Sequence, residues 1–175
     1  MGDFLFNITE WLRTTRLADV AFWAGDTGLS NWIVTHFWTT AILQVIHILA
    51  ISAAFGSILM VNLRIFNKAG AERTMAETER RYIRWIWWSL LVLVISGIGL
   101  ILSDAIRNLL NAIFWIKMIL VVTAILASLA FHRRVMRRLA AGGTVTAGIK
   151  AASLAIIALW MVIMLCGRWI AYAPT

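Results

Sequence analysis

Residues 35–57 read THFWTTAILQVIHILAISAAFGS, a largely apolar run that also holds two histidines, three threonines and a glutamine. The apolar character continues to Leu63, so the run exceeds the roughly 20 residues that a helix needs to cross a bilayer. Each polar group inside the hydrocarbon layer needs a partner there. The stretch therefore predicts a membrane-spanning helix whose first part has a polar face.

The rest of the chain is equally apolar, with 62% hydrophobic residues, ten tryptophans and one proline among 175 residues. This composition is typical of an integral membrane protein. We predict an all-α, four-helix membrane bundle in residues 30–175, with spans at about 30–66, 82–104, 109–138 and 146–172. Residues 1–29 are predicted to form an amphipathic interfacial helix and a loop, because Phe4, Ile8, Trp11 and Leu12 share one helical face.

The basic residues are concentrated in the first and third predicted loops, which hold eleven of the sixteen lysines and arginines. They are Arg64, Lys68, Arg73, Arg80, Arg81, Arg84, Arg133, Arg134, Arg137, Arg138 and Lys150. Loops that follow odd-numbered spans lie on one side of a membrane, and the positive-inside rule makes that side the cytoplasm. Both termini are then predicted to be periplasmic. We interpret the net charge of +8 as a topology signal. The basic residues are expected to contact anionic membrane lipid, and no nucleic-acid partner is expected.

Depth along the predicted helices brings several polar side chains to one level. Counting about 1.5 Å per residue from the cytoplasmic ends places His47, Lys117 and Met164 at similar heights in the outer half. The residues expected one or two turns nearer the outer surface are Gln44, Arg107 and Arg168. Ionisable groups within a membrane usually mark a site, so we predict a polar cluster in the outer half of the bundle.

Spacing also predicts that two histidines share a helical face. His36 and His47 are eleven residues apart, which is three turns and within about 20° of the same direction. Thr40 and Gln44 fall near the same line. Inward-facing histidines in helical bundles are a common place for haem, because neutral imidazole binds iron.

The first hypothesis is a membrane-bound b-type cytochrome that contains one or two haems. His47 would be an axial ligand and His36 a second ligand, while Arg168, Lys117, Arg107 and Thr40 would meet the propionates. Two bis-histidine haems need four histidines and the chain has three. The alternatives are therefore a single haem, an axial ligand from Met164, Met161 or Lys117, a five-coordinate iron, or a site shared in a homo-oligomer.

Two further hypotheses stay open. A copper-handling protein would use imidazole, thioether and thiol ligands, which suit Cu(I); the available ones are His36, His47, Met161, Met164 and Cys166. A non-catalytic scaffold would use the polar side chains only to hydrogen-bond helices together. The sequence contains no serine–histidine–acid set, paired carboxylates or zinc-protease spacing, so we favour an electron-transfer protein over an enzyme with its own substrate chemistry. Its redox partner would be a quinol or a periplasmic electron carrier.

Three stretches resemble a family of small uncharacterised bacterial inner-membrane proteins: QVIHILAISAAFGSILMVNLRIF, SGIGLILSDA and FWIKMILVVTAILASLAFHR. The matching positions are Gln44, His47, Gly56, Ser57, Leu63, Arg64, Lys117, Phe131, His132 and Arg133. The resemblance implies a bacterial inner-membrane location and adds His132 to the candidate ligands, but it implies no activity. Asn62 departs from the pattern, which has an aspartate there. The architecture is also loosely similar to four-helix b-type cytochromes and to D-type copper-resistance membrane proteins.

Overall fold

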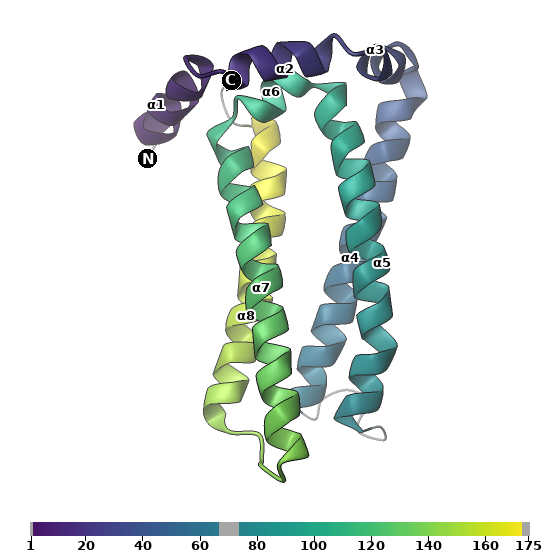
Figure 1. Cartoon of the computed structure of the whole chain (residues 1–175), viewed down its shortest axis with the longest axis vertical. Helices are drawn as coiled ribbons and strands as arrows, with labels where there is room; N and C mark the ends of the chain where they lie inside the picture. The colour runs from purple at the N-terminus through teal and green to yellow at the C-terminus, as the bar shows by residue number, and fades with distance from the viewer. Residues whose placement is uncertain (1, 67–73, 173–175) are drawn as a thin grey trace.

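The chain was analysed as a computed structural model, which describes residues 2–66 and 74–172. The described residues are helical with short turns and contain no strand (Figure 1). The elements are α1 (Gly2–Arg13), α2 (Leu17–Gly25), α3 (Gly28–Thr35), α4 (Phe37–Ile65), α5 (Met75–Ser103), α6 (Ala105–Leu109), α7 (Ala112–Ala140), α8 (Ala147–Trp169) and the 3₁₀ turn η1 (Ile170–Tyr172). Four of these helices, α4, α5, α7 and α8, are long and apolar enough to cross a membrane. The all-α four-helix fold class is therefore confirmed.

The four long helices form two antiparallel hairpins that lie side by side (Figure 1). Helix α4 packs along α5, α7 packs along α8, and the two hairpins meet mainly through α4 and α8. A hydrophobic core joins them, formed by Ile58, Ala124, Ile156, Trp160 and Ile163. Between apolar helices in a membrane, van der Waals packing of this kind and interhelical hydrogen bonds hold the bundle together.

The first predicted span is interrupted at its start. Helix α3 ends at Thr35 and α4 begins at Phe37, with His36 in an extended conformation between them (φ −95°, ψ 98°). The Thr35 hydroxyl donates to the carbonyl of Asn31 (2.7 Å), and His36 Nδ1 lies 2.8 Å from the carbonyl oxygen of Trp32. Polar side chains thus satisfy the last carbonyls of α3, which otherwise lack partners where a helix ends. The prediction of one continuous helix over 30–66 is wrong at His36, where the structure divides it into the end of α3 and α4.

Helix α5 begins at Met75, seven residues before the predicted start. A capping box explains the earlier start: the Thr74 hydroxyl accepts from the Glu77 N–H, and the Glu77 carboxylate accepts from the Thr74 N–H. Such a pair satisfies two N–H groups that have no partner within the helix. Helix α7 is capped similarly, because Asn111 Oδ1 accepts from the N–H of Ile113 at 2.8 Å.

Short helices cover one end of the bundle, which we call the upper end after its place in Figure 1. Helix α2 contacts α6, α3 contacts α5, and α1 contacts α7 and α2. Residues 1–29 thus hold two helices and the start of α3, rather than one helix and a loop. Large apolar side chains on this layer are exposed, including Phe4, Trp11, Trp23, Leu29 and Trp32. That the layer lies in a membrane interface stays a prediction.

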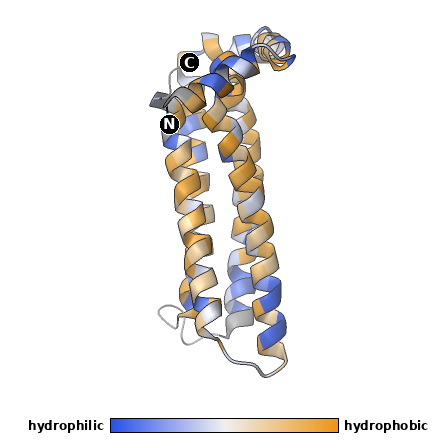
Figure 2. Ribbon diagram, turned by 90° about the vertical axis from the view of Figure 1, so that its left-hand side faces the viewer, coloured by the Kyte–Doolittle hydropathy of each residue, from blue (hydrophilic) through white to orange (hydrophobic). Residues whose placement is uncertain are grey.

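Hydrophilic residues gather at the opposite, lower end of the long helices (Figure 2), where the described basic residues of the two predicted cytoplasmic loops lie. The end of α4 carries Arg64, the start of α5 carries Arg80, Arg81 and Arg84, and the end of α7 carries four arginines. Lys68 and Arg73 lie outside the described residues. The arrangement fits a multi-pass membrane protein, and the side of the membrane that the lower end faces stays a prediction.

Candidate functional site

His47 is anchored to the neighbouring helix by a hydrogen bond. Its Nδ1 lies 2.8 Å from Ser96 Oγ on α5, and Ser96 Oγ donates to the carbonyl oxygen of Val92 at 2.6 Å. A hydroxyl has a single proton, and a carbonyl can only accept. If the serine proton is donated to Val92, Ser96 Oγ is left as an acceptor, which favours the His47 tautomer that carries its proton on Nδ1.

This hydrogen bond decides which ring nitrogen of His47 is available. In a neutral imidazole with its proton on Nδ1, Nε2 carries the free lone pair. No hydrogen bond joins Nε2 to any residue that the structure describes. A metal-binding histidine usually has this arrangement, in which the second nitrogen donates to a neighbour that fixes the ring.

The ring of His47 lies directly on the backbone of α5. A Cβ atom at Gly97 would stand 3.6 Å from His47 Cε1, which is van der Waals contact. The imidazole is half-buried rather than enclosed. A methyl group would therefore fit at this position, whereas a larger side chain would meet the ring where it approaches Ser96.

Lys117 supplies a cationic group from the second hairpin. Its side chain lies against Gly167 of α8, where a Cβ would stand 3.5 Å from Nζ. Cys166 is the residue next to Gly167 on α8, and among the described residues no hydrogen bond or ion pair joins Lys117 to Cys166 or to His47. Ion pairs join Arg13 to Glu10 and Arg107 to Asp104, and within residues 2–66 and 74–172 no carboxylate pairs with Lys117.

Each long helix thus contributes one chemically versatile side chain to the same region. These are His47 of α4, Ser96 of α5, Lys117 of α7 and Cys166 of α8, which we call the His47–Lys117 site. The sequence predicts His47 and Lys117 at one level, and in the structure they lie on facing hairpins, His47 against Gly97 of α5 and Lys117 against Gly167 of α8. Cys166 was named only as a possible copper ligand, and the hydrogen bond from Ser96 to His47 was not predicted, because the sequence does not show which faces of the helices meet.

The site lies above the tightly packed part of the bundle. Helix α4 has seven buried residues, and all of them fall between Ala50 and Ile65. None of its residues from 37 to 49 is buried. Protein side chains therefore cover α4 least over the segment that carries His47.

His36 does not belong to this site. Its side chain is exposed, its ring lies 4.8 Å from that of Trp32, and its Nδ1 is bonded within α3. The expectation that His36 and His47 share one helical face is wrong, because the chain leaves the helical path at His36. Thr40 remains half-buried on α4, whereas Gln44 is exposed.

The other predicted residues occupy different surroundings. Arg168 is exposed, donates to the Tyr172 hydroxyl at 2.8 Å, and lies over that ring at 5.1 Å. Arg107 lies 4.0 Å from Asp104 where α5 meets α6. Met164 is half-buried on α8, one turn or less from Cys166.

His132 occupies a separate, buried position near the lower end. It is 9% exposed, and its Nδ1 has no hydrogen-bond partner among the residues that the structure describes. Fifteen residues of helix separate it from Lys117, which is roughly 22 Å along α7. His132 therefore lies apart from the His47–Lys117 site.

A buried hydrogen bond between α8 and α4 was not predicted from the sequence. Ser153 Oγ donates to Asn62 Oδ1 at 2.6 Å.

Metal chemistry by side chains alone is not favoured by the arrangement. Within the residues that the structure describes, no group of three or more histidine, cysteine, aspartate or glutamate side chains could hold a metal ion. A copper ion would need methionine ligands or groups from a second copy. A prosthetic group that brings its own ligands to the metal needs fewer from the chain.

Residues 20–173 match a family described as a family of unknown function (DUF6644). The match covers most of the chain, so the chain belongs to this family. No curated protein and no solved structure matches it. The family brings no activity, and functional inference therefore depends on the geometry of the site.

Proposed function

We propose that this member of the DUF6644 family is a membrane-bound b-type cytochrome that holds one haem at the His47–Lys117 site and transfers electrons through it. The observation that carries the proposal is the hydrogen bond from His47 Nδ1 to Ser96. It fixes the imidazole and leaves Nε2 as the nitrogen that can bind iron.

The residues around His47 fit the needs of a haem. Gly97 and Gly167 remove side-chain bulk beside the imidazole and the amine, and α4 has no buried side chain over residues 37–49. Lys117 offers a cation that lacks a carboxylate partner among the described residues. A haem propionate supplies the carboxylate that such an amine needs in a region of low dielectric constant.

One haem fits better than two. His36 lies outside the site, and His132 lies roughly 22 Å away along α7, so the site contains a single histidine of this chain. The second axial position is then taken by Met164 or Lys117, by a residue of a second copy in a homo-oligomer, or by no protein group. This removes His36 from the proposed ligands.

Haem bound here would supply reversible one-electron chemistry, and the chain would set its conditions. Ser96 would fix the ring of His47 and raise its basicity as a ligand. Lys117 would orient a carboxylate, and its positive charge would favour the reduced state of a nearby redox centre. A quinol or a periplasmic electron carrier would exchange electrons with the site, in a protein of the bacterial inner membrane.

The direct experiment is an absorption spectrum of the purified protein before and after reduction with dithionite. We expect a Soret band and a reduced α-band in the wild type. His47→Ala should remove most of this absorbance, while His36→Ala, which changes a histidine outside the site, should retain it. A colourless preparation from cells supplied with haem, or equal spectra for both variants, would refute the proposal. Stoichiometric copper in colourless protein would instead favour the copper hypothesis.

A further inference from the structure

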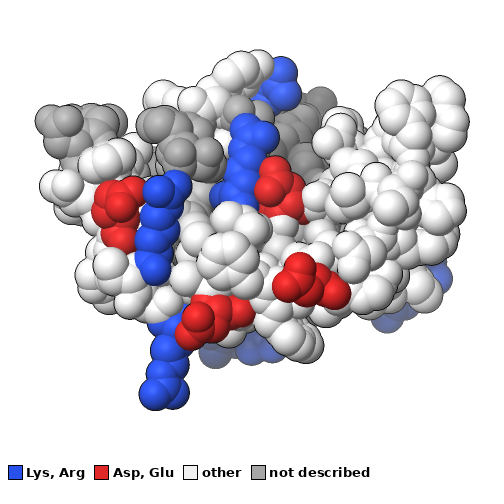
Figure 3. Space-filling model, turned by 90° about the horizontal axis from the view of Figure 1, so that it is seen from above, with Lys and Arg blue, Asp and Glu red and all other residues white. Residues whose placement is uncertain are grey.

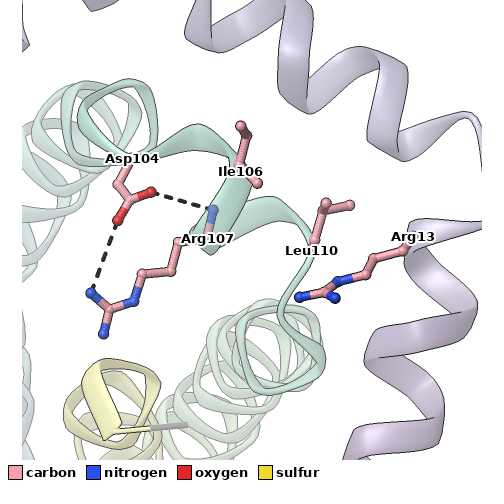
Figure 4. A pocket seen from close by; sticks show the side chains of 5 residues that line it. All are labelled: Arg13, Asp104, Ile106, Arg107 and Leu110. Carbon is pink, nitrogen blue, oxygen red and sulfur yellow. Dashed lines mark hydrogen bonds and ion pairs between the residues drawn. The ribbon is translucent and has the colours of Figure 1, made fainter. Parts of the chain in front are cut away.

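A pocket of about 330 Å³ opens at the upper end, between the last turn of α1 and the α5–α6–α7 connection (Figure 4). Its volume falls at the lower limit of pockets that bind small ligands, about 300–1,000 Å³. Its lining residues are Arg13, Asp104, Ile106, Arg107 and Leu110. None of these belongs to the His47–Lys117 site.

The lining combines both signs of charge with apolar contact. Arg13 comes from α1, Asp104 precedes α6, and the Arg107 side chain reaches back to the Asp104 carboxylate at 4.0 Å (Figure 4). Ile106 and Leu110 add apolar surface beside them. Guanidinium groups bind phosphate oxygens, and a carboxylate accepts hydrogen bonds from an ammonium group. These chemistries together match a zwitterionic phosphodiester better than a simple anion.

The position of the pocket indicates that the zwitterionic phosphodiester belongs to a membrane lipid. It lies at one end of four helices that are long and apolar enough to cross a membrane. Aromatic side chains of α1 next to it, Phe4, Phe6 and Trp11, are more than half exposed. Exposed aromatic residues on an amphipathic helix typically lie at the headgroup level. Seen from above, acidic and basic side chains both appear on this end (Figure 3).

We propose that this pocket binds the headgroup of a phosphatidylethanolamine molecule whose acyl chains run along the bundle. Arg13 and Arg107 contact the phosphate, Asp104 accepts from the primary ammonium, and Ile106 and Leu110 contact the glycerol. A choline headgroup has no N–H to donate to Asp104, and a glycerol headgroup has no cation for it. The pocket therefore distinguishes lipids by the headgroup amine.

Native mass spectrometry of the delipidated full chain in detergent can test this with phosphatidylethanolamine, phosphatidylcholine and phosphatidylglycerol. We expect one site that binds phosphatidylethanolamine about three- to tenfold more tightly than phosphatidylcholine, the effect of one charge-assisted hydrogen bond at a partly exposed position. Asp104→Asn should abolish this preference. Arg13→Ala and Arg107→Ala should each weaken binding of all three lipids by about threefold or more.

Arg16→Ala is the matched control, because Arg16 is exposed on the same layer but does not line the pocket. It should leave the lipid affinities unchanged. Water-soluble glycerophosphoethanolamine should compete only weakly, because it lacks the acyl chains. Equal affinity of the wild type for the three lipids, a preference that survives Asp104→Asn, or an equal loss in Arg16→Ala would overturn the proposal. Asp104→Asn conserves shape, so loss of selectivity with retained binding excludes misfolding as the cause.

Discussion

The buried hydrogen bond between Ser153 and Asn62 should hold the two helical hairpins together. Both side chains are completely buried, and Ser153 Oγ donates to Asn62 Oδ1 at 2.6 Å. Asn62 Nδ2 donates in turn to the carbonyl of Ile58 at 2.8 Å within its own helix. Because the hairpins meet mainly through α4 and α8, this bond fixes the contact that keeps His47 opposite Lys117.

Ser153→Ala would remove the donor and leave Asn62 Oδ1 buried without a partner. An unsatisfied buried acceptor costs about 1–3 kcal/mol, while hydrogen bonds between membrane helices average about 0.6 and reach about 1.7 kcal/mol. Since neither side chain can turn to solvent, we expect the free energy of unfolding to fall by about 1–2 kcal/mol. Combining Ser153→Ala with Asn62→Leu should recover part of this loss, because both partners then become apolar.

Reversible unfolding in mixed micelles, followed by circular dichroism, measures these differences. Ser52→Ala is the control, because Ser52 is exposed and its hydroxyl bonds only to the carbonyl of Ile48 in α4. It should change the free energy of unfolding by less than about 0.5 kcal/mol. If Ser153→Ala costs no more than Ser52→Ala, the pair does not hold α4 to α8 and the reasoning is refuted.

Three further changes have defined expectations. Gly97→Leu should push the His47 ring off α5 and weaken haem retention by about tenfold. Gly97→Ala is the control and should keep the α-band, because its Cβ would stand 3.6 Å from the ring, in van der Waals contact. Equal absorption spectra for the two variants would contradict this expectation. Thr74→Ala should speed amide hydrogen exchange in the first turn of α5 about fivefold, because loss of the capping box destabilises that turn by about 1 kcal/mol. An unchanged exchange rate would show that the capping box does not stabilise the turn. His132→Phe should leave the free energy of unfolding unchanged or raise it by up to about 1 kcal/mol, because it removes a buried nitrogen that has no hydrogen-bond partner among the described residues. A clear destabilisation in micelles would contradict this expectation.

The long apolar runs predicted the four spanning helices, because a segment that crosses the hydrocarbon layer must hydrogen-bond its own backbone groups, and a helix does so. The break at His36 was not predicted, because no glycine or proline marks it and apolar residues continue on both sides. It depends on local bonds from the side chains of Thr35 and His36 to carbonyls of α3. Such side-chain bonds compete with the helix but leave hydrophobic periodicity unchanged.

The candidate site could be predicted only in part. Depth along each helix brought His47 and Lys117 to one level, since rise per residue is fixed. Rotation of the helices and the choice of neighbours are set by packing, which a single sequence does not reveal. The bond between His47 and Ser96, and the pairing of Asn62 with Ser153 across 91 residues, therefore emerged only in three dimensions.

The central claim is that Nε2 of His47 binds a prosthetic group. Cryo-electron microscopy of the protein purified from its native membrane and held in lipid nanodiscs would test it most directly. We expect flat density for a macrocycle in contact with Nε2, with a carboxylate arm near Lys117 and the Nδ1 bond to Ser96 intact. A His47 ring surrounded only by side chains or acyl chains, at a resolution where tryptophan rings are clear, would contradict the claim.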